Sequence, residues 1–90
     1  MTYQVLIVDD EEIVCRGLTR FVKWSNYGFQ VAGTASDGEE ALSLLKKTHI
    51  DVVFMDIRMP GMTGLELLKI LRKEYPAVKA VILSGYSDLD

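Results

Sequence analysis

Acidic side chains follow two apolar segments of this sequence at the point where each segment ends. Val52–Met55 leads directly into Asp56, and Leu6–Val8 leads into Asp9–Glu12. Ionised groups are costly to desolvate, so carboxylates at the ends of buried strands are expected to destabilise the fold. If the two segments are neighbouring strands, their like charges raise at least one pKa unless they share a cation. Mg2+ is the usual cation held by carboxylate oxygens where phosphate is handled, so the pattern predicts a magnesium site.

Asp56 is the candidate nucleophile toward a phosphoryl group, because carboxylates can form acyl phosphates. The transition state of phosphoryl transfer spreads charge over three oxygens, so it needs positioning and cations more than acid–base groups. In this interpretation Asp9 and Asp10 supply the charge that holds the metal, and Ser84 donates a hydrogen bond to a phosphoryl oxygen. A single Asp at a strand end can simply cap the following turn. A pair after one strand and a third after another favours a site.

Length and composition predict one small domain that occupies residues 1–90. Hydrophobic residues make up 49% of the chain and charged residues 26%, which indicates a folded protein. The formal net charge of -3 argues against non-specific binding to nucleic acid. A single cysteine, Cys15, cannot form an internal disulfide, and no apolar stretch is long enough to span a membrane. We therefore expect a soluble, cytoplasmic protein without a membrane partner.

Four segments have the apolar character of strands, and three have the periodicity or the capping signals of helices. The expected strands are Tyr3–Val8, Phe29–Ala35, Asp51–Met55 and Lys79–Leu83. The expected helices run from Glu11 to about Val22, from a capping box at Ser36–Glu39 to Lys46 and Lys47, and from a capping box at Thr63–Glu66 to Tyr75. Strands that alternate with helices in this way form a parallel sheet with right-handed crossovers.

The expected fold class is therefore α/β, a doubly wound parallel sheet of the flavodoxin type with about four strands and three helices. Ligands of such sheets bind outside the carboxyl ends of the strands. Asp9, Asp10, Asp56 and Ser84 each come at or just after such an end. The topology by itself thus predicts that these four side chains lie together.

The motifs at the strand ends resemble those of the receiver domain of two-component response regulators. The matching segments are Val8–Glu11, Asp56–Gly64 and Leu83–Tyr86, and the likeness extends in the right order over the whole sequence. The resemblance implies that Asp56 accepts a phosphoryl group from a histidine of a sensor kinase. It also implies that Asp10 and Asp56 bind Mg2+ directly, that Arg58 contributes its backbone carbonyl, and that Asp9 acts through water.

By the same resemblance, Ser84 is the switch hydroxyl that turns toward the phosphoryl group, and the domain is a phosphoacceptor switch rather than an enzyme. It would control a transcription-factor output domain. A narrower likeness, carried by Trp24, by Tyr27–Phe29 and by Leu83–Asp88, is to receivers joined to AraC-type helix-turn-helix output domains. Those regulators often control sugar-use genes in Gram-positive bacteria. DNA binding then belongs to the output domain and not to residues 1–90.

Receivers continue after the fourth strand with a helix, a fifth strand and a fifth helix, for which this sequence shows no match. In relatives the fifth strand carries a lysine that pairs with the phosphoryl group, and neither Lys69, Lys73 nor Lys79 lies at a strand's carboxyl end. Without those elements, the fourth strand would present an apolar edge with unpaired backbone groups. We therefore expect a homodimer, or exchange of elements between copies, through this strand.

Three other functions compete with a phosphoacceptor. A phosphatase of the haloacid-dehalogenase type needs a second Asp two residues after the first, where this sequence has Arg58. A flavin-binding domain of the same fold needs a phosphate loop after the first strand, where Asp9–Glu12 would repel a phosphate. A degenerate receiver that serves only as a protein-binding or dimerisation module is the principal alternative, because no lysine of this sequence matches that of the fifth strand.

Overall fold

The computed structural model describes residues 1–59 and 61–83 of the chain. Its strands are β1 (Tyr3–Val8), β2 (Phe29–Ala35), β3 (Val52–Asp56) and β4 (Lys79–Leu83). Its helices are α1 (Glu12–Phe21), the short 3-10 helix η1 (Trp24–Tyr27), α2 (Gly38–Lys47) and α3 (Gly64–Glu74). Ser84, the expected switch hydroxyl, and the rest of the matching segment after Leu83 lie outside the described residues.

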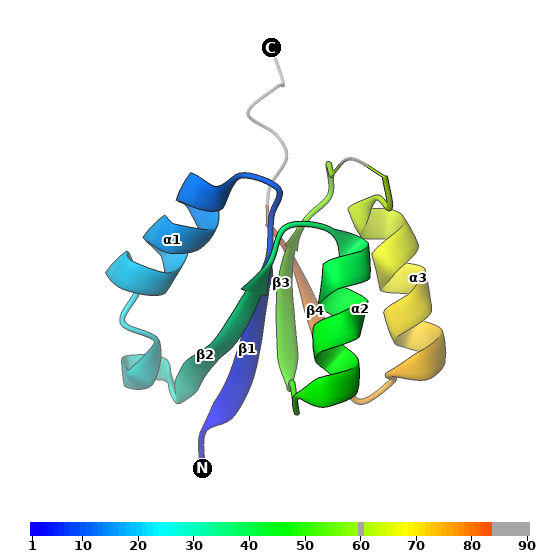
Figure 1. The fold of residues 1–90 in the computed structure, drawn as a ribbon. Coiled ribbons are helices and arrows are strands. Elements are labelled where there is room, and N and C mark those ends of the chain that lie inside the picture. The colour runs from blue at the N-terminus through cyan, green and yellow to red at the C-terminus, as the bar shows by residue number, and fades with distance from the viewer. Residues whose placement is uncertain (60, 84–90) are drawn as a thin grey trace.

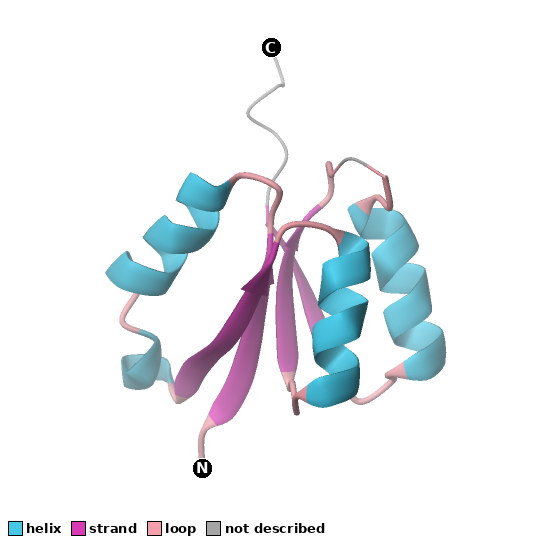
Figure 2. Cartoon of the chain, in the orientation of Figure 1, coloured by secondary structure: helices cyan, strands magenta, loops and turns pink. Residues whose placement is uncertain are grey.

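The four strands form one parallel sheet in the order β2-β1-β3-β4. Helix α1 covers one face of this sheet, and α2 and α3 lie side by side on the other (Figures 1 and 2). This arrangement confirms the predicted doubly wound α/β fold. Since β1 and β3 are adjacent in the middle of the sheet, the residues that follow their carboxyl ends must be neighbours.

Strand β1 is continuously apolar because helices cover both of its faces. Its residues Val5 to Val8 are 0% exposed. Leu6 and Val8 belong to the hydrophobic cluster under α2 and α3, whereas Val5 and Ile7 belong to the cluster under α1. Strand β2 alternates between half-buried and exposed residues and lies at an edge of the sheet, as its sequence pattern predicts.

The cluster under α1 contains few helix side chains and several aromatic rings. Cys15 is the buried residue of α1, whereas Ile13 and Phe21 are 77% and 80% exposed. The Trp24 ring packs edge-on against Phe54 of β3, with 5.2 Å between ring centroids. The apolar periodicity of α1 therefore predicts the helix correctly. It does not predict which residue packs on the sheet, because Cys15 is buried there whereas Ile13 and Phe21 are exposed.

The capping box of α3 is confirmed, whereas the one predicted for α2 is wrong by one residue. Thr63 and Glu66 cap each other's backbone amides at the start of α3. At the start of α2 the N-cap is Asp37, whose Oδ1 accepts a hydrogen bond from the Glu40 N–H at 2.8 Å. Glu40 in turn accepts from the Ser36 N–H at 2.7 Å. Asp37 replaces Ser36 as the cap because its carboxylate is the group within reach of the helix amides.

Strand β3 begins and ends one residue later than the sequence predicts. The Asp51 N–H donates to the Gln4 carbonyl at 2.8 Å, and the Asp51 side chain accepts from the Gln4 N–H at 2.7 Å, so Asp51 caps the start of the β1–β3 ladder. At the other end Asp56 is still paired in register, opposite Leu83 of β4. The strand therefore holds the backbone of Asp56 in the sheet, while the Asp56 side chain lies at the end of the sheet where the strands' carboxyl ends meet.

Candidate functional site

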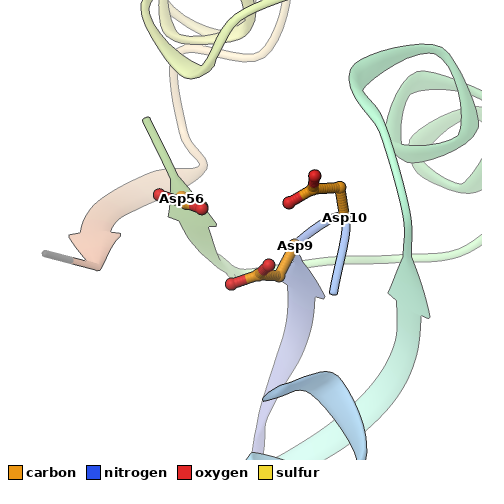
Figure 3. Close-up of side chains that lie close together, drawn as sticks. All are labelled: Asp9, Asp10 and Asp56. Carbon is orange, nitrogen blue, oxygen red and sulfur yellow. The ribbon is translucent and has the colours of Figure 1, made fainter. Parts of the chain in front are cut away.

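Three carboxylates meet where β1 and β3 end. Asp9 and Asp10 follow β1 directly, and Asp56 is the last residue of β3 (Figure 3). One oxygen of each carboxylate can be chosen such that the three atoms lie within 4.8 Å of one another. The register places Val8 of β1 opposite Met55 of β3, so the parallel ladder itself brings the next residues together. The predicted clustering of Asp9, Asp10 and Asp56 is confirmed.

The three carboxylates differ in exposure. Asp9 is 6% exposed, Asp56 is half-buried, and Asp10 is exposed. The Oδ1 atom of Asp9 accepts a hydrogen bond from the Glu11 N–H at 2.9 Å, which fixes the orientation of this buried side chain. The cluster thus combines one fixed, buried charge with two that solvent and ligands can reach.

Burial raises the pKa of Asp9 above its usual value near 3.8. The hydrogen bond from the Glu11 backbone opposes this increase, and the nearby charges of Asp56 and Asp10 add to it. A shared cation would relieve both the repulsion and the cost of burial. Hard carboxylate oxygens at this spacing are the donors that Mg2+ prefers, so the residues present fit this ion.

The backbone around Asp56 is closely packed. Its Oδ1 atom accepts a hydrogen bond from the Arg58 N–H at 3.2 Å. Gly64, the first residue of α3, lies so close that a Cβ there would overlap the Asp56 carbonyl oxygen and approach the Ile57 Cα to 2.7 Å. The Gly64 N–H also donates to the Ile57 carbonyl at 2.9 Å. Sequence reasoning placed Gly64 in a capping box but missed this close approach, which only the fold reveals.

An open pocket of about 470 Å³ lies between Asp10 and the start of α3. Its lining residues are Asp10, Ile57, Arg58, Met59, Thr63 and Leu65. A phosphoryl donor can therefore approach Asp10 and the loop after Asp56 from solvent. Arg58 itself is exposed, with its backbone two residues beyond the end of β3.

Cys15 lies beneath the site. Its thiol donates a weak hydrogen bond to the Asp9 carbonyl oxygen, with sulfur and oxygen 3.5 Å apart. Burial, and next the negative charge of Asp9, raise the pKa of this thiol. Burial thus favours the protonated thiol, which is a poor nucleophile, and its hydrogen bond supports the backbone of Asp9.

Replacing Asp9 with Asn is expected to stabilise the metal-free protein at pH 7. The folded chain binds the Asp9 proton more tightly than the unfolded chain, so ionisation of Asp9 destabilises the fold progressively as pH rises from about 3.8 through its raised pKa. Asn is neutral at every pH and removes this cost, so we expect Asp9→Asn to raise the free energy of unfolding at pH 7.

Urea unfolding at pH 7 in the presence of a chelator measures this gain. The exposed Glu39 of α2 offers a control, because Glu39→Gln removes a negative charge away from the cluster. If the free energy of unfolding of Asp9→Asn is equal to or lower than that of the native chain, the buried charge of Asp9 does not destabilise the fold.

The described part of the chain contains no helix that is long and apolar enough to cross a membrane.

The profile of the family described as "Response regulator receiver domain" matches residues 5–90. Among curated proteins, the chain is 39% identical over 88 residues to the transcriptional regulatory protein HptR of Staphylococcus aureus. It is 34% identical over 88 residues to an uncharacterised transcriptional regulatory protein, YesN, of Bacillus subtilis. Each match covers 98% of this chain but only 34% and 24% of the respective relative, so the chain spans about a third and about a quarter of their length.

Solved structures show the same relationship. The receiver domain of AraT, a response regulator from Geobacillus stearothermophilus, superposes with a TM-score of 0.88 at 38% identity, over 99% of this chain and 69% of that one. A two-component transcriptional regulator AraC from Clostridium phytofermentans superposes with a TM-score of 0.87 at 36% identity, over 98% of this chain and 68% of that one. Fold, family profile and relatives agree, and the chain belongs to the receiver domain family of two-component response regulators.

Proposed function

We propose that residues 1–90 form a phosphoacceptor receiver domain in which Asp56 takes up the phosphoryl group. The observation that carries this proposal is the cluster of Asp9, Asp10 and Asp56 at the ends of two adjacent central strands. Asp56 is the last residue of β3, and its half-buried carboxylate is oriented by the Arg58 N–H. An oriented, half-buried carboxylate beside two further acids suits a nucleophile toward phosphorus.

In the proposed reaction a carboxylate oxygen of Asp56 forms a bond to the phosphorus of the donor. The bond between phosphorus and the donor's leaving atom breaks, and the donor keeps its electron pair. The product is an aspartyl phosphate, so the chain acts as a switch that is phosphorylated and dephosphorylated and not as an enzyme on other substrates. Bound Mg2+ would supply positive charge for the phosphoryl oxygens during this transfer.

The proposed metal ligands are Asp10, Asp56 and the backbone carbonyl of Arg58, with Asp9 acting through water. The exposure of Asp10 and the burial of Asp9 support this division, because a buried, hydrogen-bonded carboxylate is less available for direct ligation. Ser84, outside the described residues, is the proposed switch hydroxyl. Its place directly after β4 supports that role, because β4 is paired with β3 beside Asp56.

The proposed donor is a sensor histidine kinase in the cytoplasm, and the proposed readout is a DNA-binding output domain outside residues 1–90. The titles of the relatives support this: HptR and YesN are called transcriptional regulatory proteins, and AraT is called a response regulator. The likeness to the Clostridium protein, which is called a two component transcriptional regulator AraC, supports an output domain of the AraC type.

Incubation with acetyl phosphate and Mg2+, followed by intact-mass measurement, tests the proposal. We expect the mass of one phosphoryl group to be added, and a chelator to prevent it. A folded chain that gains no mass under any Mg2+ concentration would instead favour a degenerate receiver that serves only as a protein-binding module.

We also propose that two copies of the chain associate through β4. This strand lies at the end of the sheet order, and its side chains Val81 and Ile82 are 39% and 36% exposed. An apolar edge strand invites pairing with another chain. Light scattering at increasing concentration should detect a dimer, and Val81→Lys should shift the protein toward monomer. A monomer at every concentration would contradict this proposal.

A further inference from the structure

Gly38, the first residue of α2, packs against Met62 in the loop between β3 and α3. Gly38 is buried, and Met62 packs against the hydrophobic cluster under α2 and α3. A Cβ at position 38 would lie 2.5 Å from the Met62 sulfur, 2.9 Å from its Cγ and 3.0 Å from its Cβ. Nonbonded carbon atoms prefer separations of about 3.5–4.0 Å. Position 38 therefore has no room for a side chain while Met62 stays in place.

The glycine at position 38 is explained by this contact and not by its backbone conformation. Among the residues that the structure describes, only Gly28 and Gly61 have a positive φ. Alanine is favoured over glycine in helices, so helix propensity argues against the residue found at position 38. The space taken by Met62 is the feature that requires glycine here.

Side-chain rotation cannot remove the whole conflict. A change of rotamer would carry the Met62 sulfur and Cγ away from a new side chain at position 38. The Cβ of Met62 is fixed by its backbone, and its contact of 3.0 Å requires the loop itself to move by a few tenths of an ångström. A larger residue at position 38 must therefore displace the backbone of the β3–α3 loop.

This loop is joined to the site by short contacts. Met62 precedes Gly64 by two residues, and Gly64 packs directly on the Asp56 carbonyl and donates to the Ile57 carbonyl at 2.9 Å. The amide of Arg58, at the other end of the loop, donates to the Asp56 carboxylate. Figure 1 shows that α2 and α3 both begin at the end of the sheet where β1 and β3 end. A displacement at Met62 is thus transmitted to the groups around Asp56.

We propose that Gly38 is a positioning residue for the metal and phosphoryl site: it leaves room for Met62 and thereby sets the position of the β3–α3 loop. The inference rests on the proposed function, since it assigns Gly38 a part in holding that same site. Gly38 itself touches neither the carboxylates nor a ligand.

Titration of the full chain with Mg2+ alone tests the inference. The chemical shifts of the backbone amides report binding at each Mg2+ concentration. Residues that hold metal ligands in place without touching the metal typically contribute about 10- to 100-fold to metal affinity, so we expect Gly38→Ala to raise the Kd for Mg2+ by about tenfold. Met62→Gly removes the Cβ together with the sulfur and Cγ, so the pair Gly38→Ala/Met62→Gly should bind Mg2+ within about twofold of Met62→Gly alone.

The outcomes separate this inference from the proposed function. Native affinity for Mg2+ in a folded Gly38→Ala variant, or weak Mg2+ binding that persists in the pair, would contradict the role of Gly38. Neither result would contradict the proposed function. A native chain that shows no Mg2+-dependent shift at all would overturn the proposed site and this inference with it. If Gly38→Ala does not fold by itself, recovery of binding in the pair supports the inference and continued loss overturns it.

Discussion

Asp56→Asn is expected to lower the rate of phosphoryl incorporation from acetyl phosphate by at least about three orders of magnitude. An amide is a far weaker nucleophile than a carboxylate, and no acyl phosphate can form at the altered side chain. The fold should persist, because Asn can still accept the hydrogen bond from the Arg58 N–H that orients the native carboxylate. The time course of intact mass in Mg2+ measures the rate.

Asp37→Asn is the matched control for this prediction. Asp37 caps α2 through one side-chain oxygen, and Asn is an equally good N-cap, so this variant makes the same chemical change away from the three carboxylates. We expect it to be phosphorylated at the native rate. A mass gain that persists in Asp56→Asn would assign the phosphoryl group to another residue.

Gly64→Ala is expected to destabilise the protein by about 3 kcal/mol. The new Cβ would overlap the Asp56 carbonyl oxygen and lie 2.7 Å from the Ile57 Cα. Both neighbours belong to the backbone, so no change of rotamer relieves the overlap, and either α3 or the end of β3 must shift. Urea unfolding followed by circular dichroism measures the change in free energy.

Gly17→Ala gives the corresponding control in α1. A Cβ at Gly17 would meet no atom within 4 Å, so only helix propensity acts, and we expect a gain of up to about 1 kcal/mol. Opposite signs for the two substitutions would support close packing on Asp56 as the reason for Gly64. A loss of similar size at both positions would show that glycine flexibility, and not the contact, determines the effect at position 64.

The fold and the central part of the site could be predicted because their signals are local in sequence. Continuous apolar runs predict strands covered on both faces, and β1 meets this condition with α1 on one side and α2 and α3 on the other. Once the strands are parallel and β1 neighbours β3, the register alone places Asp9, Asp10 and Asp56 together. The acidic cluster is thus a consequence of topology.

The features that sequence reasoning missed depend on contacts between segments far apart in the chain. The neighbours of Asp51 in sequence predict that it belongs to β3, but its carboxylate accepts a hydrogen bond from the amide of Gln4, which belongs to another strand. The burial of Cys15 follows from how α1 lies on the sheet. Likewise, the spaces that Gly38 and Gly64 leave open are filled by Met62 and by the backbone of Asp56. No pattern of spacing within a single segment encodes such contacts.

Chemical trapping of the phosphorylated residue tests the central claim most directly. Borohydride reduces an aspartyl phosphate to homoserine, so treatment after incubation with acetyl phosphate marks the residue that carried the phosphoryl group. The geometry of the three carboxylates predicts homoserine at position 56 alone, formed in Mg2+ and absent with a chelator. Homoserine at position 9 or 10, or a yield independent of Mg2+, would contradict the account.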